Sequence, residues 1–158
     1  MREKTDASSP VPWPPIVYGL AALAAAILTF AFPLTLPDGL PVWAARSLGG
    51  IIIAAGLALL FGAGGQFQKA ATPIPPIRPT TAIVKDGLYG YTRNPMYLGM
   101  TLILLGLALA TDSVWFLVAA LAALIGVTKL AIEREEAYLE RKFGADYLRY
   151  KARVRRWL

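Results

Sequence analysis

The residues of this sequence that are best able to do chemistry lie in two short polar motifs, each at one end of a hydrophobic segment. The first motif is Tyr91–Thr92–Arg93–Asn94–Pro95–Met96–Tyr97–Leu98–Gly99, which leads into an apolar segment. The second is Glu133–Arg134–Glu135–Glu136, which follows the next apolar segment. A cation, several carboxylates and tyrosine rings match a zwitterionic ligand that also has an aromatic part. If the motifs meet in space, they predict a binding site for such a ligand.

The absence of two residue types narrows the possible chemistry. The 158 residues contain no cysteine, which excludes disulfides, thiolate metal sites and cysteine nucleophiles. They also contain no histidine, the usual general base and the commonest metal ligand, so we expect no metal site. A net charge of +6 would suggest nucleic acid as a partner of a soluble protein. Here the basic residues are distributed as in a membrane protein, and no nucleic-acid partner is expected.

Long apolar segments indicate the fold class. Hydrophobic residues make up 56% of the chain, too many for a soluble domain of this length. We therefore predict an all-α, polytopic membrane protein with about four transmembrane helices in two hairpins and a C-terminal amphipathic helix. A single integral membrane domain over 1–158 would comprise a leader (1–15), spans at about 16–32, 42–62, 95–110 and 114–132, and a tail (133–158). The proline-rich stretch over 62–86 is predicted to be non-helical.

The basic residues predict the orientation of these spans. Every lysine and arginine except Arg46 lies in the leader, between the second and third spans, or from Lys129 onward. By the positive-inside rule both termini are cytoplasmic, and so are the two polar motifs. The short hinge 111–113 makes the last two spans antiparallel neighbours, so Arg93 and Glu136 are expected to come close. The basic run over 149–156 is predicted to contact anionic membrane lipids.

Each feature also has an ordinary structural explanation. Arg93 next to a span is typical of an orientation anchor, and Tyr89, Tyr91 and Tyr97 are typical of interfacial aromatic residues. The glutamates can form a solvated helical turn. Taken alone, the residues favour these explanations over a binding site. The glycines of the second span would let a neighbouring helix approach closely and permit dimerisation, which leaves the oligomeric state open; they are Gly49, Gly50 and Gly56.

A family resemblance changes this balance. The first motif resembles the Arg-His/Asn-Pro-x-Tyr-x-Gly signature of the isoprenylcysteine carboxyl methyltransferase and phospholipid methyltransferase superfamily. The glutamate pair and the residues after it are similar to the closing motifs of that superfamily; they are Glu135, Glu136, Leu139, Phe143, Gly144, Tyr147 and Tyr150. The resemblance covers about 79–156, roughly half the chain. It implies a multi-pass protein of a bacterial cytoplasmic membrane that methylates a lipophilic small molecule or lipid entering from the bilayer.

The resemblance also implies S-adenosylmethionine as the cofactor, bound at the cytoplasmic ends of the last two spans. Arg93 would then pair with the cofactor's carboxylate and Glu135 or Glu136 with its ammonium group, while Tyr97 or Tyr91 would lie near the sulfonium. Arg93, Asn94 and Glu136 are the implied catalytic residues. The full set of implied cofactor contacts is Tyr91, Arg93, Pro95, Tyr97, Gly99, Glu135, Glu136, Tyr147 and Tyr150.

Departures from the family pattern leave alternatives open. Asn94 stands where several relatives carry histidine, and the arginine that the carboxyl methyltransferases place before the glutamates falls near Ala131, so that Lys129 or Arg134 would have to substitute. The missing histidine mildly favours an anionic or neutral acceptor, with Glu133, Glu135 or a tyrosine still open as a base. Two other functions remain possible: a nicotinamide-dependent membrane reductase related to sterol reductases, and a non-catalytic membrane scaffold.

Overall fold

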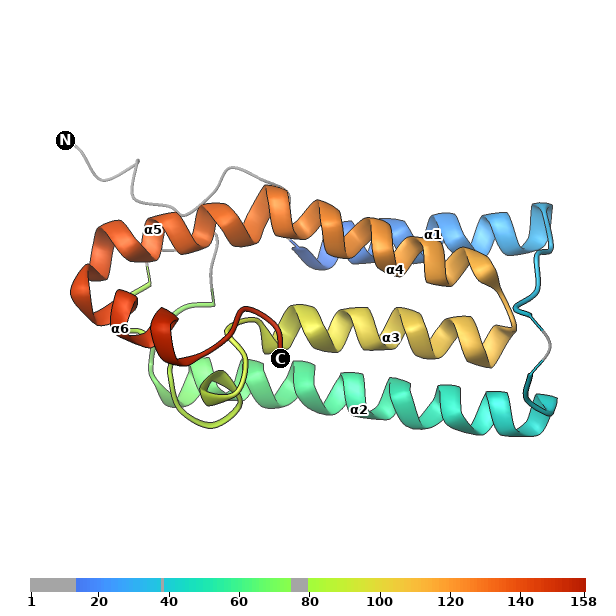
Figure 1. The fold of residues 1–158 in the computed structure, drawn as a ribbon, viewed down its shortest axis with the longest axis horizontal. Coiled ribbons are helices and arrows are strands. Elements are labelled where there is room, and N and C mark those ends of the chain that lie inside the picture. Colours follow the sequence, from blue (N-terminus) through green and yellow to red (C-terminus); the bar gives the residue numbers. More distant parts are fainter. Residues whose placement is uncertain (1–13, 38, 75–79) are drawn as a thin grey trace.

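Four long helices lie side by side in the computed structural model, which describes residues 14–37, 39–74 and 80–158 (Figure 1). They are α1 (Pro14–Ala31), α2 (Val42–Lys69), α3 (Pro95–Thr111) and α4 (Val114–Val127). A short 3₁₀-helix, η1 (Gly87–Gly90), precedes α3. Within these three ranges every regular element is helical, so the all-α prediction is confirmed.

The helices have the length and composition of membrane spans. In the part of the chain that is described, three helical segments are long and apolar enough to cross a bilayer: α1, α2 and the continuous helix Val114–Phe143. With 17 residues, α3 is at the lower end of the length that spans the hydrocarbon core. The prediction that the chain leaves helix at residue 62 was wrong, because α2 continues to Lys69. The glycines at 62, 64 and 65 destabilise a helix without ending it, and the first proline of the stretch 62–86 is Pro73. The helix can therefore continue beyond residue 62.

The helices pair differently from the prediction. The expected antiparallel pair of the last two spans is present, as α4 packs against α3. The expected hairpin of the first two spans was wrong, because α2 packs along α3 while α1 packs along α4. Polar contacts at the end of the bundle explain this. The Trp115 indole N–H donates to the Phe32 carbonyl at 2.6 Å, and the Thr29 and Ser113 hydroxyls lie 2.6 Å apart. These contacts fasten the end of α1 to the start of α4.

Two glycine pairs bring α2 and α3 into backbone contact. Gly49 lies against Gly106, and Gly56 lies against Gly99. A Cβ at Gly106 would fall 2.7 Å from the Gly49 carbonyl oxygen, and one at Gly99 would fall 2.6 Å from that of Gly56. The close helix approach expected at Gly49 and Gly56 therefore occurs within the chain. Gly50 faces open space.

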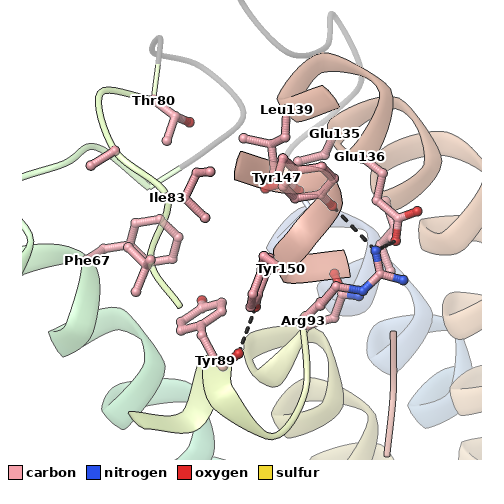
Figure 2. Close-up of a pocket in the computed structure, with 14 residues that line it drawn as sticks. Phe67, Thr80, Ile83, Tyr89, Arg93, Glu135, Glu136, Leu139, Tyr147 and Tyr150 are labelled. Carbon is pink, nitrogen blue, oxygen red and sulfur yellow. Dashed lines mark hydrogen bonds and ion pairs between the residues drawn. The ribbon is translucent and has the colours of Figure 1, made fainter. Parts of the chain in front are cut away.

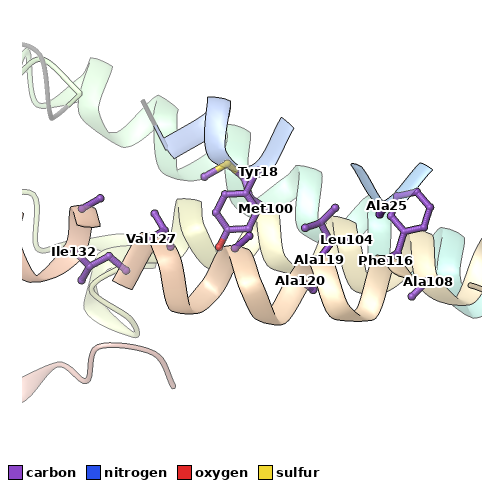
Figure 3. Close-up of a cluster of buried hydrophobic side chains, with 12 residues drawn as sticks. Tyr18, Ala25, Met100, Leu104, Ala108, Phe116, Ala119, Ala120, Val127 and Ile132 are labelled. Carbon is purple, nitrogen blue, oxygen red and sulfur yellow. The ribbon is translucent and has the colours of Figure 1, made fainter. Parts of the chain in front are cut away.

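The main hydrophobic core forms where α1, α3 and α4 meet (Figure 3). Its larger buried side chains are Tyr18, Met100, Leu104, Phe116, Val127 and Ile132. The Tyr18 hydroxyl lies 2.8 Å from that of Thr101, which ties α1 to α3. Large apolar residues such as Ile51, Phe61 and Ile125 point outward, as expected for side chains that face lipid.

The tail continues from α4 and then folds back over the bundle. A π-helical turn, η2 (Thr128–Ile132), leads directly into α5 (Glu133–Phe143). Gly144 adopts a positive φ of 52°, a conformation that favours glycine, and α6 (Ala145–Arg153) starts after it. The predicted interruption of the tail at Gly144 is confirmed. In Figure 1, α6 and the C-terminus turn back toward the first residues of α3.

Candidate active site

A buried ion pair joins the two polar motifs. Arg93 lies just before α3 and Glu136 in the first turns of α5, and Arg93 Nη1 is 3.2 Å from Glu136 Oε1. Each side chain is only 9% exposed. The expected proximity of these two residues is therefore confirmed, and burial distinguishes the pair from an interfacial anchor in water.

A second arginine binds the same carboxylate. Arg156 Nε donates to Glu136 Oε1 at 3.0 Å, and Arg156 Nη2 donates to Oε2 at 2.9 Å. This hydrogen bonding raises the pKa of the Arg156 guanidinium. The predicted contact of Arg156 with lipid headgroups is therefore wrong, and Arg156 takes the place that was expected for Lys129 or Arg134 as the substitute cation beside the glutamates. Lys129 instead pairs with Glu133 at the surface, and Arg134 is exposed.

The first motif also holds the backbone of the tail. Asn94 Nδ2 donates to the Arg156 carbonyl at 2.9 Å, and Thr92 Oγ1 donates to the same oxygen at 3.1 Å. The backbone N–H of Arg93 donates to the Arg155 carbonyl at 3.0 Å. Asn94 thus positions the segment that carries Arg156.

A cavity of about 500 Å³, its mouth included, lies beside the ion pair; we call it the tail-side cavity (Figure 2). Arg93, Glu136 and Tyr147 form one side in Figure 2, and the rings of Phe67 and Tyr89 lie across from them. Those two rings meet edge to face, with centroids 5.3 Å apart. Its other lining side chains include Thr80, Ile83, Asn94, Glu135, Leu139 and Tyr150.

A second cavity of about 680 Å³, mouth included, lies against the start of α1; we call it the α1-side cavity. Apolar side chains dominate its walls, namely Pro14, Pro15, Phe67, Ile74, Met96 and Met100. Arg93, Asn94 and Glu135 line both cavities. The rings of Phe67 and Tyr89 also line both cavities, and Glu136 lines only the tail-side one, so the α1-side cavity is the better suited to a hydrocarbon group.

Two buried polar atoms of residues that line the tail-side cavity lack a partner. Arg93 Nε and Thr80 Oγ1 make no hydrogen bond within the described ranges. Because buried polar atoms are normally satisfied, both indicate a polar ligand. The adjoining carboxylate, guanidinium groups and aromatic rings fit an amino-acid zwitterion that is attached to an aromatic base, as S-adenosylmethionine is.

The buried tyrosines act as neutral hydrogen-bonding groups. Burial, with a smaller contribution from the Glu136 charge, raises the pKa of Tyr147 to about 12, and Arg93 opposes this shift. Arg93 Nη1 donates to the Tyr147 hydroxyl at 3.5 Å. The Tyr150 hydroxyl donates to the Tyr89 carbonyl at 2.8 Å, and burial raises the pKa of both phenols.

Not every residue implied by the resemblance reaches a cavity. Tyr91 is 78% exposed and lines neither of them. Pro95 is fully buried as the first residue of α3, and Gly99 packs against α2 at Gly56. Tyr97 lines the α1-side cavity, and Tyr147 and Tyr150 line the tail-side one. Sequence reasoning missed Phe67, Thr80, Ile83 and Arg156, which no motif marks.

The comparison with known families agrees with this geometry. The sequence profile of a family described as "Phospholipid methyltransferase" matches residues 44–146, more than half of the chain. The chain belongs to this family. A Haemophilus influenzae protein described as uncharacterized is 43% identical over 63 residues, which are 40% of this chain and all of that protein. No solved structure matches significantly.

As a member of the phospholipid methyltransferase family, this chain is a membrane methyltransferase. The matched region contains α3, α4, both polar motifs and all of α2 except its first two residues. It ends at Asp146, so Tyr147, Tyr150 and Arg156 lie beyond it. The structure places Tyr147 and Tyr150 in the wall of the tail-side cavity and Arg156 on the Glu136 carboxylate.

Proposed function

We propose that this phospholipid methyltransferase family member transfers a methyl group from S-adenosylmethionine to a lipophilic small molecule or lipid at the edge of the bilayer. One observation carries the proposal: the buried Arg93–Glu136 pair lines a cavity together with Thr80, and Arg93 Nε and Thr80 Oγ1 have no hydrogen-bond partner within the described ranges. The family supplies the reaction class, and this site supplies charges that match the amino-acid part of the donor.

The chain's own residues would bind and orient the donor. Arg93 Nε is free to donate to a carboxylate. The Glu136 carboxylate, which now holds Arg156 and Arg93, can accept an ammonium group in exchange for one of them. The rings of Phe67, Tyr89 and Tyr147 offer faces for an adenine or a sulfonium. Bound S-adenosylmethionine supplies an already activated methyl group, so the protein mainly contributes alignment and exclusion of water.

The α1-side cavity suits the acceptor. Its walls are mainly apolar, and helices with lipid-facing surfaces surround it. An acceptor held there would bring its reactive group to the wall formed by Arg93, Asn94 and Glu135, beyond which the tail-side cavity begins. A lipophilic acceptor could reach this cavity from the bilayer without crossing water.

Titration calorimetry on the detergent-solubilised protein tests the cofactor. We expect S-adenosylmethionine and its demethylated product to bind in the micromolar range, roughly −8 kcal/mol, and NADPH to show no comparable affinity. Binding of NADPH without S-adenosylmethionine would instead favour a reductase, and binding of neither would favour a scaffold.

Methyl-labelled donor tests the acceptor class. Membranes that contain the protein should transfer label to the organic-extractable fraction, and membranes with the Glu136→Ala variant should not. Label that appears only in water-soluble products would contradict a lipophilic acceptor while leaving a methyltransferase in place.

A further inference from the structure

A third cavity lies at the end of the bundle where α2 begins and α3 ends, opposite the candidate active site (Figure 1). It has a volume of about 820 Å³, mouth included, and we call it the far-end cavity. At about 1.5 Å per residue, the 17 residues of α3 separate it from Arg93 by roughly 25 Å. Its apolar walls include Leu36, Pro37, Leu40, Val42 and Leu109.

One side chain of each charge lines the far-end cavity. Arg46 belongs to the first turns of α2, and Asp112 follows the last residue of α3. One carboxylate oxygen of Asp112 accepts a hydrogen bond from the backbone N–H of Leu36 at 3.1 Å. Within the described ranges neither Arg46 nor Asp112 forms an ion pair, and both side chains are exposed. A guanidinium and a carboxylate are thus both open to a ligand in the same cavity.

Both charges occupy positions that the fold itself does not favour. Arg46 is the one basic residue of the sequence away from the predicted cytoplasmic segments, against the positive-inside rule. It also lies near the start of α2, where the helix dipole favours an anion over a cation. Asp112 has a positive φ of 51°, a conformation in which glycine would be less strained. Neither charge is explained by the stability of the helices, which indicates a ligand with both a negative and a positive group.

The surroundings of the far-end cavity indicate that this ligand is a lipid. Trp43, next to the lining residue Val42, is 73% exposed, and exposed indoles are typical of the membrane interface. Leu40 and Val42 line the cavity and are exposed as well, so its mouth is apolar. A phosphate matches Arg46, and a primary ammonium matches Asp112. A head group that is only anionic would instead place negative charge beside the Asp112 carboxylate.

We infer that the far-end cavity binds a zwitterionic phospholipid with a primary ammonium, of the phosphatidylethanolamine type. Its phosphate pairs with Arg46, its ammonium pairs with Asp112, and the start of its acyl chains packs on the apolar walls. This lipid is a structural ligand and not a methyl acceptor, because its ammonium lies the length of α3 away from the candidate active site. It holds the α1–α2 connection against α3, since Asp112 also binds the backbone of Leu36.

Protection of a single cysteine from a maleimide gives a local readout, because the native chain has no cysteine. Leu40→Cys places the thiol in the cavity wall, and Thr35→Cys places it in the same connection outside the cavity. In a maltoside detergent without phosphate, dihexanoyl-phosphatidylethanolamine should slow the labelling of Leu40→Cys until the effect saturates. Labelling of Thr35→Cys should not change.

Two further probes test which parts of the lipid are recognised. Dihexanoyl-phosphatidylglycerol lacks the ammonium, and O-phosphoethanolamine lacks the acyl chains. Each should need at least about a tenfold higher concentration for the same protection of Leu40→Cys, because a charge-assisted hydrogen bond or the apolar contact is lost. Equal protection by phosphatidylglycerol would overturn the assignment of Asp112 to an ammonium. Equal protection by O-phosphoethanolamine would make this a site for a soluble ligand and overturn the lipid.

Charge-removing variants test the two contacts directly. Arg46→Gln and Asp112→Asn, each combined with Leu40→Cys, should raise the half-protecting concentration of dihexanoyl-phosphatidylethanolamine about tenfold. Asparagine tolerates the backbone conformation of Asp112 and can still accept the hydrogen bond from Leu36. Lys69→Gln, which removes a charge at the other end of α2, is the control and should leave protection unchanged. Absence of protection in Leu40→Cys alone, or wild-type protection in either cavity variant, would overturn the inference.

Discussion

Glu136 is the central residue of the site because two guanidinium groups bind its carboxylate. Arg93 reaches it from the start of α3, and Arg156 reaches it from the end of the tail with two hydrogen bonds. Removing one member of a buried ion pair leaves a charge without compensation. Exchange of one arginine for a ligand ammonium keeps the charges matched.

Substitution of the pair should therefore weaken cofactor binding. Arg93→Ala and Glu136→Ala are each expected to lower S-adenosylmethionine affinity by more than ~1.5 kcal/mol, the scale of a charge-assisted hydrogen bond. Calorimetry measures the change, and circular dichroism checks that the helices remain.

Arg155→Ala is the matched control for this pair of variants. The Arg155 side chain is exposed, and only its backbone carbonyl contacts Arg93. Its affinity should stay at the wild-type value. Unchanged affinity in the Arg93 and Glu136 variants as well would return both residues to a purely anchoring role.

The raised pKa of Glu135 predicts a pH-dependent stability. The folded state favours the protonated carboxyl, with a pKa of about 7 against an ordinary value of 4.5. This contribution is fully present below pH 4.5 and is lost as pH rises through 7. Glu135→Gln should therefore unfold at a higher temperature than wild type at pH 8, with little difference at pH 4. Equal melting temperatures of the two proteins at pH 8 would show that burial of the ionised Glu135 carboxylate does not lower the stability of the fold.

At this scale the sequence predicted the charged pair but not its surroundings. The short hinge after α3 was enough to bring Arg93 and Glu136 together. Arg156 could not be predicted, because it follows the last helix, where no periodicity applies. The tyrosines show a second limit: η1 buries Tyr89 and leaves Tyr91 exposed, and an irregular loop gave no indication of which tyrosine would point inward.

Among the helix pairs, α2 and α3 have the most extensive packing. Their glycine pairs place backbone against backbone along the length of α3. Lipid is as apolar as a leucine side chain, so helices in a bilayer gain most from this kind of close packing. The contact fixes α3, whose first turn positions Arg93 and Asn94 just before it.

A methyl group in this contact should destabilise the protein. In Gly106→Ala the new Cβ would meet the Gly49 carbonyl and the Ile53 backbone nitrogen, neither of which can move aside alone. We expect a loss of about 1–3 kcal/mol, measured as thermal or denaturant unfolding in detergent. Gly50→Ala points into open space and should be neutral or slightly stabilising. Equal effects of the two substitutions would show that the helices do not pack through these glycines.

Helix positions were easier to predict than helix partners. Hydrophobic length located α1, α3 and α4 to within a few residues, and Gly144 located the break in the tail. Short connections predicted the α3–α4 pair, but the same reasoning failed for α1 and α2. The side-chain bonds from Trp115 and Ser113 to the end of α1 decide that pairing, and they join residues more than eighty positions apart.

At the scale of the whole molecule, positive charge is distributed unevenly between the two ends of the helix bundle. Among the described residues, the lysines and arginines other than Arg46 lie at the end of α2, before α3 or after α4, whereas Arg46 lies in the first turns of α2, at the opposite end of that helix. In a bacterial cytoplasmic membrane this asymmetry would place the site and both termini in the cytoplasm.

Cysteine labelling tests this orientation on a background that contains no native cysteine. Thr35→Cys lies in the exposed connection between α1 and α2, and Lys69→Cys lies at the exposed end of α2. An impermeant thiol reagent added to intact cells should label the first and spare the second until the membrane is opened. The opposite pattern would invert the protein and place the site outside.

The wide turn η2 has a consequence for how the chain tolerates changes in length. The backbone N–H of Glu133 bonds to the carbonyl of Thr128, five residues earlier, so this turn holds one residue more than an α-helical turn. Deletion of Leu130 should let the turn close into regular α-helix while α4 and α5 keep their phase, and Glu136 should still meet Arg93. Deletion of Leu121 within α4 should instead rotate all that follows by about 100°. We expect cofactor binding to be retained after the first deletion and lost after the second. The helix would then tolerate the loss of one residue at η2 while Arg93 and Glu136 remain in contact.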